Sequence, residues 1–414
     1  MSPKEEKSPP KRNFSVFGGL LLLLLVFLAV WYLEPLFNLY RFLKDGRYLM
    51  LFGNNAEIRG SGGFLGSFAV LEIRNKKIKK IFFETNVYQK DRGYEAKSQT
   101  LLPEFFQDEW KGIKTSFVNS NWPADFREAT AQSTLPVYEE IWSDKIDGVV
   151  AIQASLVLEA LKLTGPIAFK DDDLVVTPEN FLKEIQYRVE TGYFEDPNNV
   201  LINQPKTILA DFLPLFWQKL VTLPKRELYT FVQKMLQEKN LVFYFKDETR
   251  QRIVEKKNWA GTVVKTGQKN YLYINNTNIG GRKSSLNVKE EVELKVNAEN
   301  KAVLKIKRRH IGDGKWPDSE NKNYTRVYAP YGSELLAGEV RVDEELGKTV
   351  FGFWSTVPAG QTKEFVLEYQ LPAKINPKVL FWQKQIGGSQ TLLDYFFANR
   401  QIFSGVLNQD ELIE

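Results

Sequence analysis

The chain has 414 residues, a formal net charge of +5, no cysteine and a single histidine, His310. The absence of cysteine excludes disulfides, thiolate nucleophiles and cysteine-ligated zinc, and one histidine argues against a histidine-rich metal site or a Ser-His-Asp triad. The 56 basic and 51 acidic residues nearly balance, so charge gives no reason to expect a nucleic-acid partner.

The first element predicted along the chain is a membrane-spanning helix at residues 14–33. This segment carries no charge, and twenty apolar residues match a hydrocarbon core of about 30 Å at about 1.5 Å per residue. Four basic residues lie between positions 4 and 12, so the positive-inside rule places the N-terminus in the cytoplasm. A cleaved signal peptide is the alternative, but bulky residues follow the apolar run. We expect a cytoplasmic stub at residues 1–13 and a single-pass protein of the cell membrane with an extracellular remainder.

Strands and helices alternate over residues 46–257. Strand-like runs occupy residues 48–52, 68–73, 78–84, 147–153 and 241–245, and helical patterns lie between them, the longest at residues 123–142. Such alternation predicts a three-layer α/β domain in which helices flank a central sheet.

The pattern changes after residue 258. Short alternating runs separated by Gly, Asn, Asp and Pro continue to residue 385, which predicts a β-sandwich domain over residues 258–385. Residues 386–414 are assigned to a C-terminal extension, in which residues 392–403 have some helical character.

The glycine-rich stretch at residues 59–66 is the strongest local signal for a site. It lies between two strands and contains no Gly-Lys-Ser/Thr, so it is neither a P-loop nor a dinucleotide fingerprint. Backbone N–H groups at Gly62 and Gly63 can point at an anion, and Arg59 can bind a phosphate or carboxylate with two hydrogen bonds. The alternative is a structural bulge in which Arg59 pairs with an acid such as Glu57.

Five further candidate ligand-binding residues lie at element ends or on a helix. Asp91 and Arg92 follow the third predicted strand, Asp125 and Arg127 open the long helix, and Arg188 lies in a later helix. Each also has a structural explanation as a helix cap, a surface ion pair or a solvated side chain. No spacing identifies a set of metal ligands or a catalytic residue.

Two motifs at the start of the α/β region resemble the hallmark of a bacterial family of unknown function, DUF4012. They read FGNNAEIR at residues 52–59 and GGFLGS at residues 62–67. Further matching segments are NWPADF at 121–126, DGVVAI at 147–152, LTGPI at 163–167, VYAPYGS at 327–333 and QKQ at 383–385. The activity of that family is unassigned, so this resemblance implies an architecture rather than a function.

The order of elements is also similar to the LytR-CpsA-Psr fold. Members of that family are single-pass envelope proteins that transfer glycopolymers from polyprenyl-pyrophosphate carriers to peptidoglycan, with Arg and Asp residues around the pyrophosphate and Mg²⁺. This resemblance implies that Arg59, Arg92, Arg127 and Arg188 clamp pyrophosphate and that Mg²⁺ is a cofactor. The sequence departs from the pattern at Asn55, where that family has aspartate.

Three functions remain open from the sequence. The first is a membrane-anchored envelope protein that binds a phosphorylated lipid-linked glycan or a cell-wall polymer through an Arg/Gly-rich cleft. The second is an active Mg²⁺-dependent glycopolymer phosphotransferase, because phosphoryl transfer needs positioned positive charge and no cysteine or histidine nucleophile. The third is a non-catalytic scaffold or adhesion module that acts through its β-sandwich. In each case the lipid bilayer is an expected partner.

Overall fold

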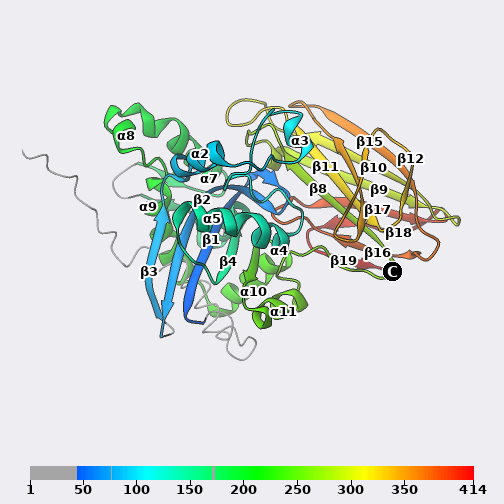
Figure 1. The fold of residues 1–414 in the computed structure, drawn as a ribbon, viewed down its shortest axis with the longest axis horizontal. Coiled ribbons are helices and arrows are strands. Elements are labelled where there is room, and N and C mark those ends of the chain that lie inside the picture. The colour runs from blue at the N-terminus through cyan, green and yellow to red at the C-terminus, as the bar shows by residue number, and fades with distance from the viewer. Residues whose placement is uncertain (1–43, 76, 170–172) are drawn as a thin grey trace, which may run out of the picture.

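The computed structural model describes residues 44–75, 77–169 and 173–414. The membrane helix expected at residues 14–33 and the stub at residues 1–13 lie outside these ranges. Within the described part of the chain, no helix is both long and apolar enough to cross a membrane. The described residues form a mixed α/β part, drawn at the left of Figure 1, and a β-rich C-terminal part at its right, as the sequence predicts.

A five-stranded sheet of order β3-β2-β1-β4-β7 is the centre of the α/β part. Strands β1 (Gly46–Arg59), β2 (Gly62–Arg74) and β3 (Lys77–Glu84) form an antiparallel meander. Strand β4 (Gly148–Gln153) pairs with β1 in parallel, and β7 (Leu241–Phe245) pairs with β4 antiparallel at the edge. Because β1 and β4 are parallel neighbours, the C-terminal end of β4 at Gln153 lies beside Gly53, and β1 continues past it to Arg59.

Helices cover both faces of this sheet. One face packs on α2 (Val87–Lys97), α4 (Phe126–Ala129) and α5 (Leu135–Trp142). The other face packs on α6 (Ala154–Thr164), α7 (Phe181–Glu190), α9 (Thr207–Leu220), α10 (Lys225–Gln237) and α11 (Glu248–Lys256). Short helices α3 (Glu104–Gln107) and α8 (Pro197–Ile202) complete this part. Successive side chains of β1 point to opposite faces of the sheet. Tyr48 and Met50 pack in the core beneath α6, α7, α9, α10 and α11, and Leu49 and Leu51 pack in the core beneath α2, α4 and α5.

The long helix expected at residues 123–142 is interrupted. It starts at Phe126, because Asp125 caps it and accepts a hydrogen bond from the backbone N–H of Glu128 at 3.0 Å. A π-helical turn at Thr130–Thr134 separates α4 from α5. Pro136 follows in the first turn of α5, and a proline cannot donate the i→i−4 hydrogen bond that an uninterrupted α-helix requires.

Two six-stranded sheets form a β-sandwich in the C-terminal part. Their strand orders are β12-β15-β10-β9-β17-β18 and β13-β14-β11-β8-β16-β19. The strands are β8 (Lys269–Asn278), β9 (Val288–Val296), β10 (Lys301–His310), β11 (Asn323–Pro330), β12 (Glu334–Ala337), β13 (Arg341–Glu345), β14 (Lys348–Trp354), β15 (Thr362–Gln370), β16 (Asn376–Gln383), β17 (Thr391–Phe397), β18 (Arg400–Leu407) and β19 (Glu411–Ile413). Apolar side chains from both sheets meet in one core between them.

The last three strands correct the expectation for residues 386–414. These residues do not form a separate extension, because β17 and β18 belong to one sheet of the sandwich and β19 to the other. The helical character expected at residues 392–403 is wrong. Leu393 and Tyr395 are buried in a period of two, and Ala398 and Asn399, both with positive φ, make the hairpin turn between β17 and β18.

The two parts are joined by hydrogen bonds at the turn between β1 and β2. The side-chain amide of Gln385 donates to the carbonyl of Arg59 at 2.9 Å, and that of Asn275 donates to the carbonyl of Gly60 at 2.7 Å. Arg326 donates to the carbonyl of Trp122 at 2.7 Å. The glycine-rich turn is therefore buried between the α/β part and the sandwich.

Candidate functional site

Glycine at positions 62 and 63 allows two strands to approach closely. A Cβ added at Gly63 would lie 2.3 Å from the carbonyl carbon of Asn54, and Gly62 has a φ of +132°. The backbone N–H of Gly63 donates to Oε1 of Gln153 at 2.8 Å. This amide is therefore occupied by a side chain of β4.

Arg59 lies in the contact between the two parts of the molecule and is 1% exposed. Its guanidinium group donates to Oε1 of Glu57 at 2.7 Å and to the carbonyl of Asn278 at 2.5 Å. Lys283 pairs with the other oxygen of Glu57. Burial opposes the ionisation of Glu57, but the charges of Arg59 and Lys283 outweigh it and lower the pKa of this carboxyl. The three side chains form a buried ionic cluster that has one net positive charge.

Asp91 and Arg92 point into different surroundings. The carboxylate of Asp91 is buried and accepts hydrogen bonds from the backbone N–H groups of Phe117 and Val118 at 2.5 and 3.3 Å. Burial raises the pKa of Asp91 to about 6, although these hydrogen bonds oppose the shift. Arg92 is exposed. Asp91 thus fixes the segment that follows α3.

The remaining candidates also contact separate neighbours. Besides capping α4, Asp125 accepts from the backbone N–H of Val263 at 2.7 Å and so ties the helix to the start of the C-terminal part. Arg127 pairs with Glu255 of α11 at 2.9 Å. Arg188 is half-buried in α7. None of the eight candidates is among the residues that line the two cavities described below.

The larger cavity is an apolar cleft in the α/β part, with about 920 Å³ of empty space including its mouth. It lies at the C-terminal end of β4 beside residues 52–54 of β1, between the sheet and helices α6, α7 and α9. Its apolar lining consists of Phe52, Phe64, Phe83, Ile152, Val157, Phe181, Leu182, Ile185, Val189, Leu209, Phe212 and Leu213. Such a lining excludes water and offers a hydrocarbon chain the environment it prefers.

Lys206 and Lys283 bring positive charge to this apolar cleft. Lys206 is 4% exposed, and its Nζ lies 4.6 Å from the ring centroid of Tyr88. Among the described residues, no carboxylate lies within 4 Å of this ammonium group. Burial, reinforced by the charge of Lys283, lowers the pKa of Lys206 to about 7. The absence of a side chain at Gly66 makes space for the ammonium group of Lys206, because a Cβ at position 66 would lie 2.9 Å from Nζ.

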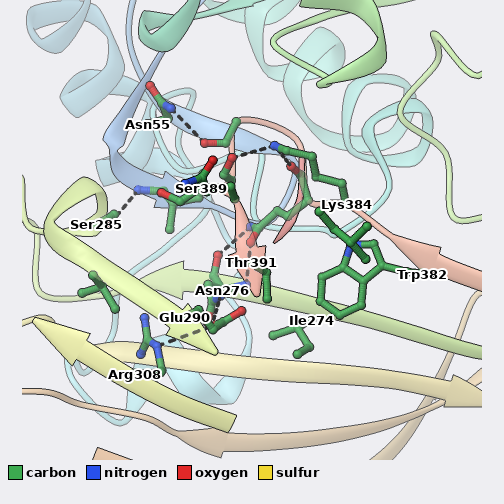
Figure 2. A pocket seen from close by; sticks show the side chains of 17 residues that line it. Asn55, Ile274, Asn276, Ser285, Glu290, Arg308, Trp382, Lys384, Ser389 and Thr391 are labelled. Atoms are coloured by element: carbon green, nitrogen blue, oxygen red, sulfur yellow. Dashed lines mark hydrogen bonds and ion pairs between the residues drawn. The ribbon is translucent and has the colours of Figure 1, made fainter. Parts of the chain in front are cut away.

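The second cavity is a polar pocket between the end of β1 and the sandwich (Figure 2). Asn55 and Ile58 contribute from β1, Glu290 and Arg308 from β9 and β10, and Trp382 from β16. Adjacent residues of the FGNNAEIR motif thus face different cavities, since Asn54 lines the apolar cleft and Asn55 the polar pocket.

The fold is that of an α/β domain, containing an apolar cleft, joined to a β-sandwich. Residues 44–189 match the model of a family described as a protein of unknown function (DUF4012). The resemblance to this family that the motifs indicate is confirmed over that segment.

Two solved structures are similar to part of the chain. The Lin1025 protein from Listeria innocua shares 11% identity, with 53% of this chain and 79% of that chain covered and a TM-score of 0.24. The transcriptional regulator YvhJ from Bacillus subtilis shares 13% identity, with 54% and 80% covered and a TM-score of 0.24. Similarity this low identifies no shared site. No curated protein matches the chain.

Proposed function

We propose that the protein is an envelope protein that binds an anionic, phosphate-bearing lipid, with the lipid chain in the apolar cleft. The observation that supports this most directly is Lys206, a buried ammonium group with no carboxylate within 4 Å among the described residues, in a cavity whose lining is mainly apolar. A buried charge without a partner is costly, and a phosphate brought by a ligand would supply the missing negative charge. The membrane helix expected at residues 14–33 would hold the cleft close to the bilayer from which such a lipid comes.

The charges around Lys206 favour an anionic head group over a neutral one. The ionic cluster of Arg59, Glu57 and Lys283 has one net positive charge, and Lys283 also lines the cleft. Glu190 also lines the cleft and opposes this charge, but both Glu190 and Glu84 act on Lys206 from beyond ion-pair distance. Arg59 thus enters this proposal as the residue that holds Glu57, rather than as a direct phosphate ligand.

Binding is proposed here in preference to phosphotransfer. A Mg²⁺-dependent reaction needs a set of oxygen ligands for the ion. In the described ranges, no group of three or more His, Asp or Glu side chains is placed to hold a metal. Asn55, which stands where the LytR-CpsA-Psr pattern has aspartate, brings a neutral amide that donates to the carbonyl of Gly387, so no reaction step is assigned.

Farnesyl pyrophosphate, farnesol and inorganic pyrophosphate can separate the contributions of chain and head group. Calorimetric titration of residues 34–414 should show binding of farnesyl pyrophosphate and at least about tenfold weaker binding of the other two. Val157→Trp fills the cleft and should abolish binding. Lys206→Met should weaken binding at least about tenfold, whereas the exposed Lys183→Met should leave it unchanged.

Two results would overturn the proposal. If none of the three probes binds, the cleft does not hold such a lipid. If pyrophosphate alone binds as tightly as farnesyl pyrophosphate, the protein has an anion site in which the apolar lining takes no part.

A further inference from the structure

The polar pocket contains hydrogen-bonding groups that the protein itself leaves unused. The indole N–H of Trp382 is buried and has no hydrogen-bond partner among the described residues. A buried indole N–H normally finds an acceptor, so this donor is available to a molecule that enters the pocket. The hydroxyl groups of Ser389 and Thr391 also line the pocket, and no hydrogen bond to a described residue engages either of them.

Glu290 provides the matching acceptor. One oxygen of its carboxylate accepts from the side-chain amide of Asn276 at 3.2 Å and faces Nε of Arg308 at 3.7 Å. Its other oxygen has no partner among the described residues. Figure 2 shows Glu290 directed at Arg308, with Trp382 on the other side of Ile274. The pocket therefore combines free donors with a free acceptor.

The positively charged groups of the polar pocket already have hydrogen-bond acceptors in the protein. Arg308 uses both terminal nitrogens on Ser355 and Asn321, and its charge opposes that of Glu290. The ammonium group of Lys384 donates to the carbonyls of Gln385 and Gly388. Glu290 opposes one of these two positive charges, so the polar pocket has one net positive charge. Nζ of Lys384 is nevertheless hydrogen-bonded to two carbonyls, whereas no hydrogen bond or ion pair to a described residue engages Nζ of Lys206 in the apolar cleft.

Apolar side chains form the remaining wall, among them Ile58, Val288 and Leu407. The pocket has about 620 Å³ of empty space including its mouth. A ligand that fits must therefore be small, must both donate and accept hydrogen bonds, and must have an apolar face. A pyranose ring has these properties, because its hydroxyl groups lie around the edge and its C–H groups form the faces.

We propose that the polar pocket binds one neutral sugar unit, such as the end of an envelope glycan. A hydroxyl of the sugar would donate to Glu290, and another oxygen would accept from the indole of Trp382. Glycoside hydrolysis generally uses a pair of carboxyl groups, and Glu290 is the one carboxylate that lines this pocket in the described chain. The inferred role is therefore recognition of the sugar without cleavage.

Saturation-transfer NMR on the full chain in phosphatidylcholine nanodiscs, which contain no sugar, would test this inference. The probes are glucose, galactose, mannose and N-acetylglucosamine, and at least one should show saturable transfer with a dissociation constant of about 1 mM or below. Trp382→Phe retains an aromatic ring and removes the N–H, while Glu290→Gln retains the shape and removes the charge. Each should weaken binding at least fivefold.

The controls separate the sugar site from general effects. Trp354→Phe alters an indole that donates to Asp108 elsewhere, and Val157→Trp fills the apolar cleft, so neither should affect sugar binding. Should Glu290→Gln not fold, Trp382→Phe and Thr391→Val decide the question. The inference is overturned if none of the four sugars binds, which would leave a pocket that holds only water, or if the pocket variants bind as well as the unchanged protein.

Discussion

Lys206 keeps an ammonium group inside an apolar cleft, next to the ring of Tyr88 and beyond ion-pair distance of any described carboxylate. An unfolded chain would give this lysine its ordinary pKa near 10.5, whereas burial lowers the pKa in the folded protein to about 7. Between these values the folded state binds fewer protons than the unfolded state, so the free energy of unfolding rises with pH. The destabilisation caused by burying the charged ammonium group is fully present below about pH 7, where Lys206 is protonated in both the folded and the unfolded state.

Replacing this lysine should therefore stabilise the protein in a pH-dependent manner. Lys206→Met should raise the free energy of unfolding at pH 6 by on the order of a few kcal/mol, and the gain should shrink as the pH approaches 10. Urea unfolding at several pH values would measure this, with Lys183→Met as the exposed control. If the gain in the free energy of unfolding does not change with pH, the buried charge of Lys206 does not destabilise the folded protein.

The sequence identifies Arg59 as a candidate site residue but does not show which distant residues it contacts. Its partner Glu57 is two residues away and was an open alternative, whereas Asn278 and Lys283 lie more than 200 residues further along the chain. Lys206 had no local signal, because it stands in a polar loop before α9 and becomes a buried cation only when the helices close over the sheet. Residue types identify the charges, and the tertiary fold decides which of them lack a partner.

The bulged end of β1 is the element that separates the two cavities. The pairing with β2 shifts register between Asn54 and Ile58, so that Gly63 lies against the backbone of Asn54 and Asn55. An added Cβ would come within 2.3 to 2.6 Å of three backbone atoms, which cannot rotate away as a side chain can.

Gly63→Ala should therefore destabilise the protein by ~3 kcal/mol or more. Gly93 offers a matched control, since it lies within α2 with no atom within 4 Å of an added Cβ. Gly93→Ala should stabilise the protein by about 0.5–1 kcal/mol, because alanine favours a helix over glycine. Denaturant unfolding of both variants would compare them, and equal effects would contradict the assigned role of Gly63.

Elements with a strong periodic pattern were predictable from the sequence, and those decided by local exceptions were not. Strands β3, β4 and β7 lie close to their predicted positions. Strands β1 and β2 are longer than predicted, because the glycine-rich stretch expected as a loop is paired as strand except at residues 60–61. The helix expected at residues 123–142 was missed in detail, because the cap at Asp125 and the proline at position 136 divide it. Residues 391–407 were missed as strands, since the turn at Ala398 and Asn399 contains no glycine.

At the scale of the whole molecule, the two parts share one buried junction. The ionic cluster around Glu57 joins β1 to the loop after β8, and Gln385 hydrogen-bonds both the turn after β1 and the backbone of β8. Asn55 also donates to the carbonyl of Gly387 at 2.8 Å. Both the wall of the apolar cleft and the polar pocket therefore depend on a correctly folded sandwich.

The C-terminal strands are needed for that sandwich. Strand β17 lies between β9 and β18, and it pairs with β9 along its whole length. Its loss would leave the backbone N–H and C=O groups on one edge of β9 unpaired and would expose the core between the sheets. A chain that ends at residue 385 should consequently aggregate or lack fixed tertiary structure.

A shorter truncation provides the comparison. Removing residues 411–414 deletes only the edge strand β19, so that chain should fold with reduced stability. Near-ultraviolet circular dichroism and size-exclusion chromatography would distinguish a packed monomer from an aggregate in each case. A chain ending at residue 385 that stays monomeric and unfolds cooperatively would mean that the last strands are dispensable, as a separate extension would be, and that the junction is held by β8 and β16 alone.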